Sequence, residues 1–215
     1  MPRDPASDRF VPDPRRRYTA QEAIDFPADG KRWELVHGQL LATTDVTVGH
    51  QQILQDVELA LREYLASVGR QDTVWHAPAD IMWADDMLIK PDIFVVPPGP
   101  ILEDWSSVDE LLLAIEISSP ETVEADRGVK RRAYLEHGVP CYWVIDPNTR
   151  TVEEWHPGDD APRSVNGPLR WRASADLAEC VIPIQDIITE NARWVGVSVK
   201  EFFRRLLSGP PPTDG

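Results

Sequence analysis

Two carboxylates on strands that the sequence predicts to be buried are the first candidates for chemistry. Asp92 follows Pro91 beside the apolar run 93–96, and Glu116 lies near the end of the apolar run 111–117. A buried carboxylate is costly unless it is paired, hydrogen-bonded or bound to a cation. Since Mg²⁺ prefers carboxylate oxygens and water, the two side chains on neighbouring strands predict a shared divalent-metal site for cutting a phosphodiester.

Each carboxylate also has a structural explanation. Asp92 could cap a turn, and Glu116 could be satisfied by a backbone amide or an arginine. Alternate residues of a strand share a face, so Glu116 is expected to point with Ala114 and Ser118. A metal site becomes the stronger interpretation because Asp92 and Glu116 are predicted on adjacent strands.

Three polar residues at spacing four follow Glu116 on a predicted helix over 124–137. Asp126, Lys130 and Tyr134 are therefore expected to line one helix face. The ordinary explanation is a surface Asp–Lys pair, which stabilises a helix by only about 0.2–0.5 kcal/mol. The functional explanation is a phosphate-contacting surface, because the same helix carries three arginines at 127, 131 and 132.

Hydrophobic periodicity predicts the elements that position these side chains. Helices are predicted at 20–26, opened by a Thr19–Glu22 capping box, and at 50–68, 124–137 and 197–207. Strands are predicted at 33–36, 37–41, 73–83, 88–96, 111–117, 141–145, 151–155, 169–171 and 179–182. This order predicts an α/β fold with a mixed β-sheet flanked by helices and with added antiparallel strands.

Composition divides the 215 residues into three predicted parts. Residues 1–17 are charged and proline-rich and predict a flexible arm, residues 18–207 a single domain, and residues 208–215 a disordered tail. The net charge of −14 counts against nucleic-acid binding by simple electrostatics. It does not exclude a nuclease, because bound cations reverse the field at the site.

Several other classes of site lack support in the sequence. Cys141 and Cys180 have no metal-ligand spacing, and both are expected to be small buried hydrophobes in the reducing cytoplasm. No apolar run approaches the roughly 18 residues of a membrane helix, so no membrane partner is expected. Zinc spacing of histidines, phosphate-binding glycine loops and a serine-nucleophile elbow are all missing. His50, at a helix start, could approach the carboxylates.

Taken together, the motifs resemble a known family. The matching segments are Glu34 to Leu40, His50, Pro91-Asp92, Glu116 to Pro120, Asp126, Lys130, Tyr134 and Gly138 to Pro147. This ordered set resembles the Uma-type restriction endonucleases of the PD-(D/E)XK nuclease superfamily over residues 19 to 185. The resemblance implies a restriction-endonuclease-like core and Mg²⁺-dependent cleavage of DNA, with Mn²⁺ as a substitute.

The resemblance also implies roles for individual residues. Asp92 and Glu116 would take the metal-binding positions. The lysine expected two residues after the glutamate is here Ser118, so the superfamily motif is broken at that point. Lys130, from the following helix, becomes the candidate for the missing lysine.

The implied mechanism is a metal-assisted hydrolysis. Asp92, Glu116 and the Ile117 carbonyl would hold Mg²⁺, which activates a water and polarises the phosphate. Lys130 would orient that water or stabilise the developing negative charge, and Glu34 would tether a second metal. The accessory residues would be Asp126, which keeps Lys130 charged, together with Tyr134 and His50.

Two other functions stay open at this stage. One is a catalytically inactive nuclease fold that serves as a binding or assembly module, which Ser118 and the net charge favour. The other is a hydrolase of a different phosphate ester. A homodimer is expected by analogy, because cutting both strands of DNA usually calls for two active sites.

Overall fold

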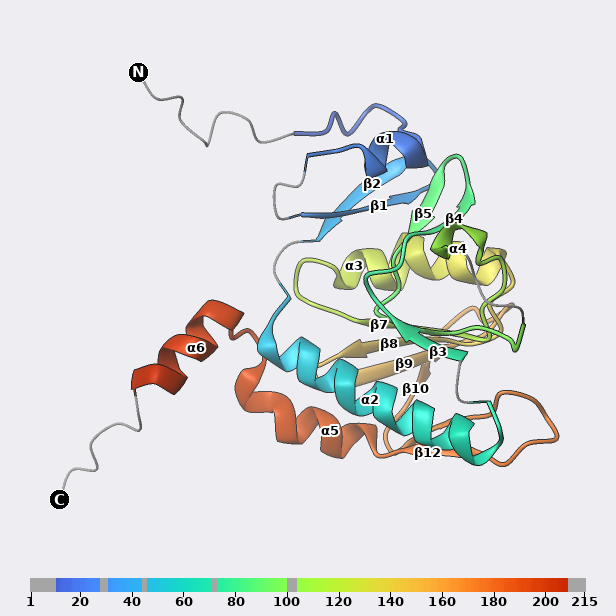
Figure 1. Cartoon of the computed structure of the whole chain (residues 1–215), viewed down its shortest axis with the longest axis vertical. Coiled ribbons are helices and arrows are strands. Elements are labelled where there is room, and N and C mark those ends of the chain that lie inside the picture. The colour runs from blue at the N-terminus through green and yellow to red at the C-terminus, as the bar shows by residue number, and fades with distance from the viewer. Residues whose placement is uncertain (1–10, 28–30, 44–45, 71–72, 100–103, 209–215) are drawn as a thin grey trace.

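The computed structural model describes residues 11–27, 31–43, 46–70, 73–99 and 104–208. A six-stranded mixed sheet forms its centre, in the order β10-β9-β8-β7-β6-β3 (Figure 1). Its strands are β3 (Val74–His76), β6 (Ile93–Val95), β7 (Leu113–Ile117), β8 (Tyr142–Asp146), β9 (Thr151–Trp155) and β10 (Arg163–Ser164). Among its described pairs, β7 and β8 alone run parallel.

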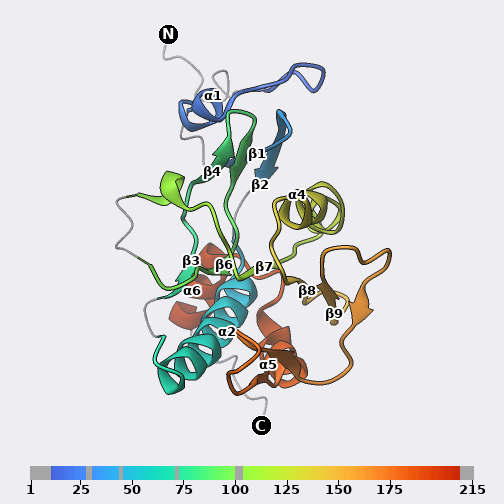
Figure 2. The same ribbon diagram turned by 90° about the vertical axis from the view of Figure 1, so that its right-hand side faces the viewer.

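Two helices cover one face of this sheet, as the end-on view shows (Figure 2). They are α2 (Val48–Ser67) and α5 (Ile184–Asn191). Ile115 and Ile117 of β7 point into this apolar layer. The small sheet of β11 (Leu169–Trp171) and β12 (Cys180–Ile182) contributes to the same core.

The opposite face supports a second sheet and a helix. The four-stranded antiparallel sheet has the order β2-β1-β5-β4. Its strands are β1 (Arg32–Val36), β2 (Gln39–Thr43), β4 (Ile81–Ala84) and β5 (Met87–Ile89), and α1 (Ala20–Ile24) packs beside them. Between the two sheets lies a helix that begins as α3 (Val123–Ala125) and ends as α4 (Arg131–Glu136) (Figures 1 and 2).

A π-helical turn, η4 (Asp126–Lys130), interrupts this helix. The sequence predicts a continuous helix over 124–137, so the π turn is a departure from that prediction. Single π turns inside α-helices are often found at functional sites. Here the turn contains two buried charged residues, Asp126 and Lys130.

Two long predicted strands are wrong, because each is divided between the two sheets. Residues 73–83 form β3 and β4, and residues 88–96 form β5 and β6. Pro91 has no amide hydrogen for a strand ladder, and the amide of Lys90 donates to the Glu34 carboxylate at 3.1 Å instead. The chain therefore leaves one sheet at Ile89 and enters the other at Ile93, which puts Asp92 at the junction.

Other differences concern helices. The helix α5 was not predicted, although Ile184, Ile187, Ile188 and Asn191 have the spacing of a helix face and are all buried. The predicted helix over 50–68 begins two residues earlier, because the Thr47 hydroxyl accepts from the amide of His50 as an N-cap. The capping box of Thr19 and Glu22 is confirmed.

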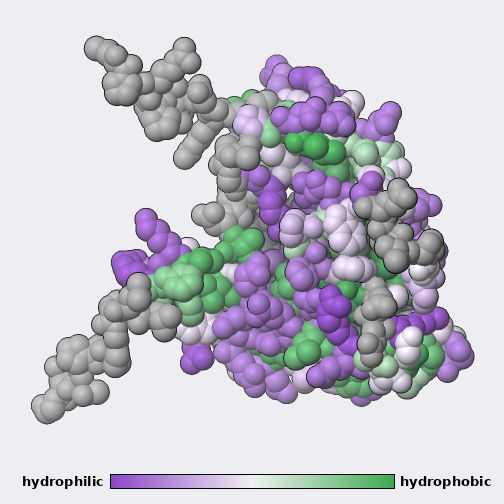
Figure 3. Space-filling view, in the orientation of Figure 1, coloured by the Kyte–Doolittle hydropathy of each residue, from purple (hydrophilic) through white to green (hydrophobic). Residues whose placement is uncertain are grey.

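The last helix, α6 (Val199–Ser208), starts later than the predicted 197 and projects from the body (Figure 1). Val199 and Phe203 of this helix are exposed, and Figure 3 shows apolar side chains on this part of the molecule. Two short 3₁₀ turns, η3 (Trp105–Ser107) and η5 (Ala192–Trp194), complete the described elements.

The predicted division into arm, domain and tail remains a prediction. Residues 1–10 and 209–215 lie outside the described residues. At the end of the predicted arm, the guanidinium of Arg17 donates to the carbonyl of His37 at 2.8 Å. In the described part of the chain, no helix is long and apolar enough to cross a membrane.

Gly49, in the first turn of α2, gives a test of the contact between α2 and the segment after α5. A Cβ at Gly49 would lie 2.8 Å from the carbonyl carbon of Trp194 and 2.9 Å from its oxygen. We expect Gly49→Ala to destabilise the protein by about 1–3 kcal/mol, because backbone must move to make room. Urea unfolding measures the change.

The matched control is Gly128→Ala, where a Cβ meets nothing within 4 Å. Alanine favours helix over glycine by up to about 1 kcal/mol, so this variant should be neutral or more stable. Equal losses in both variants would contradict the close approach at Gly49.

Candidate active site

Five buried charged side chains meet where the two sheets and the π turn approach one another. Glu34 comes from β1, Asp92 from the link before β6, Glu116 from β7, and Asp126 and Lys130 from η4. Each residue is between 1% and 6% exposed. They line a pocket of about 320 Å³, on the side of the molecule where the space-filling view is indented (Figure 3).

The ammonium of Lys130 lies among three carboxylates. Its Nζ is 2.7 Å from Glu116 Oε1, 3.2 Å from Glu34 Oε1 and 3.3 Å from Asp126 Oδ1. Burial by itself would lower the pKa of Lys130, but these carboxylates outweigh burial and raise the pKa well above its usual value. Lys130 is therefore a buried cation held in its charged form.

Glu116 is the most crowded of the acids. The Tyr134 hydroxyl donates to its Oε1 at 2.7 Å, on the same oxygen that contacts Lys130. Burial raises the pKa of Glu116 well above its usual value and Lys130 opposes that rise, whereas Asp92, Asp126 and Glu34 add to it. Burial and the charges of Glu116 and Glu34 also raise the pKa of Tyr134, so its hydroxyl stays a donor.

Asp92 faces the pocket from the other side. His50 Nε2 lies 3.0 Å from its Oδ2, and the amide of Ile117 donates to the same oxygen at 2.9 Å. Arg32 is 3.8 Å from Oδ1. Burial would raise the pKa of Asp92, but the charges of His50, Arg32 and Lys130 together with the His50 hydrogen bond lower it to about 2.

The π turn is held in place by hydrogen bonds to Asp126. The Ser118 hydroxyl donates to Asp126 Oδ2 at 2.8 Å, and the Tyr142 hydroxyl donates to the Asp126 carbonyl at 3.0 Å. Ser118, which occupies the expected lysine position, thus positions the acid beside Lys130. The Lys130 ammonium therefore reaches the pocket from η4 and not from the end of β7.

The structure brings together all the residues predicted for the site. Their roles remain predictions, whereas their proximity is observed. Arg32 was missed, although it stands two residues before Glu34 on the same strand and so shares its face. That spacing is the signal that could have found it.

Two of the three arginines of the predicted phosphate-contacting surface make contacts within the protein, and the third, Arg132, is exposed. Arg127 pairs with Glu153 at 2.7 Å and with Asp146 at 3.5 Å. Arg131 stacks over the ring of Trp155, with its guanidinium carbon 4.3 Å from the ring centroid. Both arginines therefore fasten the helix to the sheet.

The residues present fit a hard divalent cation. In the described residues, the hydrogen bonds of Asp92 and Glu116 fall on one oxygen of each carboxylate, while Asp92 Oδ1 faces the Arg32 guanidinium at the longer distance of 3.8 Å. Asp126 Oδ1 is buried, accepts no hydrogen bond from the described part of the chain and lies 3.3 Å from the Lys130 ammonium. Four buried carboxyls share the pocket with two cations, Lys130 and Arg32, so an additional positive charge would be favourable.

A family model described as "Uma2: Putative restriction endonuclease" matches residues 20–184. The chain belongs to the Uma2 family. Membership supports a nuclease, and the predicted resemblance is confirmed. The match spans the six-stranded sheet and every residue of the acidic pocket apart from Val195 and Gly196 at its rim.

A solved structure has the same fold. The chain matches the crystal structure of a protein from Anabaena variabilis, described as a "putative nuclease belonging to DUF820", with a TM-score of 0.63 and 18% identity. The match covers 80% of this chain and 98% of the other. It confirms the predicted α/β, restriction-endonuclease-like architecture of this Uma2 chain. None of the curated proteins matches significantly.

Asp92 gives a pH-dependent test of the site's electrostatics. A carboxyl whose pKa falls from 3.8 to about 2 on folding stabilises the folded state by about 2 kcal/mol above about pH 4. This stability is lost as the pH falls through the folded pKa. The advantage of wild type over Asp92→Asn in urea unfolding should shrink by about half between about pH 7 and about pH 3.

The measurement uses chelator-treated protein, so that bound metal does not contribute. An advantage that stays constant over this pH range would contradict the lowered pKa.

Proposed function

We propose that this chain is a Mg²⁺-dependent DNA endonuclease, with Asp92 and Glu116 as metal ligands and Lys130 as the catalytic cation. One observation carries the proposal. The ammonium of Lys130, supplied from the π turn, lies 2.7 Å from Glu116 and lines the same pocket as Asp92. Two acids and a lysine are thereby assembled although the superfamily's lysine position holds Ser118.

The metal would be held by Asp92 and Glu116, with the Ile117 carbonyl and waters completing its shell and Glu34 available to a second ion. A bound Mg²⁺ or Mn²⁺ supplies Lewis-acid polarisation of the phosphate and a more acidic water. His50 and the Ile117 amide hold one oxygen of Asp92, which orients its other oxygen.

Lys130 would stabilise the negative charge that develops on the phosphate during cleavage. Its ammonium is kept protonated by three carboxylates, so it is a donor rather than a base. In a pocket largely closed to water, a preorganised cation stabilises developing charge on a phosphate oxygen more strongly than it would in solution. Asp126 and Ser118 position this lysine, and Tyr134 positions Glu116.

DNA as substrate, a homodimer and a cytoplasmic location complete the proposal. The family's description supports DNA as the substrate, and cleavage of both strands calls for two copies of the site. Both described cysteines are free thiols, which is consistent with a reducing compartment.

Cleavage of plasmid and single-stranded DNA in Mg²⁺ or Mn²⁺ tests the activity. Wild type should cut, and Asp92→Ala should not. Lys130→Ala should lose about 10²-fold or more in rate, since it removes the charge-stabilising group, while its metal binding is retained.

The matched control is Lys90→Ala. The Lys90 side chain pairs with Asp80 at 2.9 Å, while its backbone amide still donates to Glu34, so this variant should keep full activity. Full cleavage by Lys130→Ala would contradict the role of the migrated lysine. If wild type neither cuts DNA nor binds metal, the protein is an inactive nuclease fold that serves as a binding module. Cleavage of small phosphodiesters alone would indicate a different phosphate-ester hydrolase.

Calorimetry of Mg²⁺ binding tests the ligands separately. Glu116→Gln should abolish Mg²⁺ binding, and it should also lower the stability of the folded state, because it removes the carboxylate closest to the buried Lys130 ammonium. Unchanged Mg²⁺ affinity in a folded Glu116→Gln protein would show that the ligand is another residue.

A further inference from the structure

A second group of metal-ligating side chains lies at the opposite end of β8 from the acidic pocket. In the antiparallel pair of β8 and β9, Tyr142 faces Trp155 and Trp143 faces Glu154. The residues on either side of the first pair, Cys141 and His156, therefore also face each other. Since alternate residues share a face, Cys141, Glu154 and His156 all project to one side of the hairpin.

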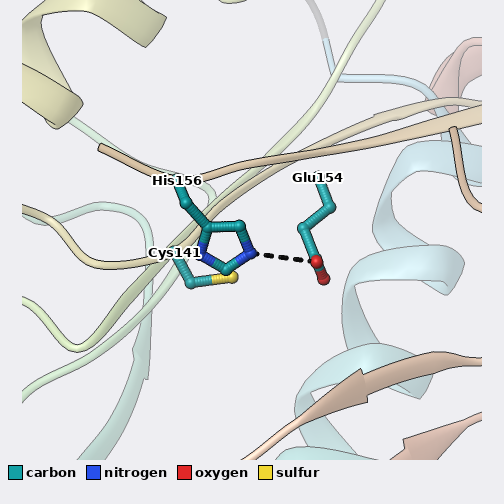
Figure 4. A group of neighbouring side chains, drawn as sticks. All are labelled: Cys141, Glu154 and His156. Atoms are coloured by element: carbon teal, nitrogen blue, oxygen red, sulfur yellow. Dashed lines mark hydrogen bonds and ion pairs between the residues drawn. The ribbon is translucent and has the colours of Figure 1, made fainter. Parts of the chain in front are cut away.

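Their ligand atoms converge. Cys141 Sγ, a Glu154 carboxylate oxygen and a His156 ring nitrogen all lie within 4.8 Å of one another. Figure 4 shows the thiol, the imidazole and the carboxylate turned toward one another. Cys141 is buried, whereas Glu154 and His156 are partly exposed and border a cavity of about 430 Å³.

Each oxygen or nitrogen ligand is oriented by a partner. His156 Nδ1 lies 2.8 Å from the Pro140 carbonyl, so Nδ1 carries a proton and Nε2 is directed toward Glu154 at 3.0 Å. The Trp143 indole donates to Glu154 Oε2 at 3.1 Å, which turns Oε1 toward the imidazole. Metal-binding histidines typically donate the N–H of their other ring nitrogen to a carbonyl in this way.

We propose that Cys141, Glu154 and His156 bind one thiophilic divalent cation of the Zn²⁺ class, at a site separate from the nuclease centre. Zn²⁺ takes a set of one thiolate, one imidazole and one carboxylate, whereas Mg²⁺ prefers oxygen ligands alone. The cavity beside them gives room for a water as fourth ligand. Tetrahedral bonds of about 2.0–2.3 Å separate ligand atoms by about 3.5 Å. This spacing lies inside the 4.8 Å limit that holds for the three atoms and is slightly wider than the 3.0 Å between His156 Nε2 and Glu154.

The charges around Cys141, Glu154 and His156 allow a cation to bind. Without metal, Glu154 is balanced by His156 and by Arg163, whose guanidinium lies 3.9 Å from Oε1. The Arg163 side chain is 62% exposed, so it can turn to solvent when a cation arrives. Binding displaces to solvent the Cys141 thiol proton and the proton shared between His156 Nε2 and Glu154, and it leaves thiolate–metal and imidazole–metal bonds. The cation would then tie the start of β8 to the chain just after β9.

Cobalt spectroscopy of the full chain tests this site without reference to nuclease activity. Co²⁺ added to wild type should produce a thiolate-to-metal absorption band at one equivalent. The band should persist in Cys180→Ser, the matched buried cysteine, and in Glu116→Gln. It should disappear in Cys141→Ser, and His156→Ala should weaken Co²⁺ binding about tenfold or more.

Alkylation of the wild-type protein gives a second measurement that needs no variant at the site. Zn²⁺ should slow iodoacetamide labelling of Cys141 and leave the rate at Cys180 unchanged, as read by mass spectrometry. The proposal is overturned if wild type shows no thiolate band with saturating Co²⁺, if the band survives in Cys141→Ser, or if Zn²⁺ does not protect Cys141.

Discussion

The buried ammonium of Lys130 is the interaction on which the rest of the site depends. A charge removed from water is stable only where opposite charges surround it, and here the compensating acids come from separate parts of the fold. Glu34 belongs to the four-stranded sheet and Glu116 to the six-stranded sheet. The lysine between them ties both sheets to the helix that separates them, so the electrostatics of the site also hold the layers together.

The short link between β5 and β6 is the second constraint. Pro91 ends one strand ladder, the Lys90 amide turns to Glu34, and Asp92 is left beside His50 and Ile117. The same break that transfers the chain from one sheet to the other thus delivers a carboxylate to the pocket. A continuous strand over 88–96 would keep its ladder of hydrogen bonds unbroken. It would then belong to one sheet and would not connect the two.

The two clusters of potential metal ligands differ in chemistry and lie at opposite ends of the same strand. The acidic pocket offers oxygen donors and one lysine, which suit a hard cation that keeps its waters. The group at Cys141 offers sulfur, nitrogen and oxygen, which suit a thiophilic ion. Because the ligand types differ, the two sites would select different metals from the same solution.

Residue order alone was enough to predict the parts of the protein that depend on a local pattern. The buried β7 around Glu116, the spacing of Asp126, Lys130 and Tyr134, and the family all followed from residue order, because periodicity and short motifs are properties of neighbouring residues. Tertiary contacts set what depends on distant residues: the split at Lys90–Asp92, the π turn, and the approach of Cys141 to His156. Strand pairing and sheet packing set these contacts, and neither is encoded in the spacing of residues along the chain.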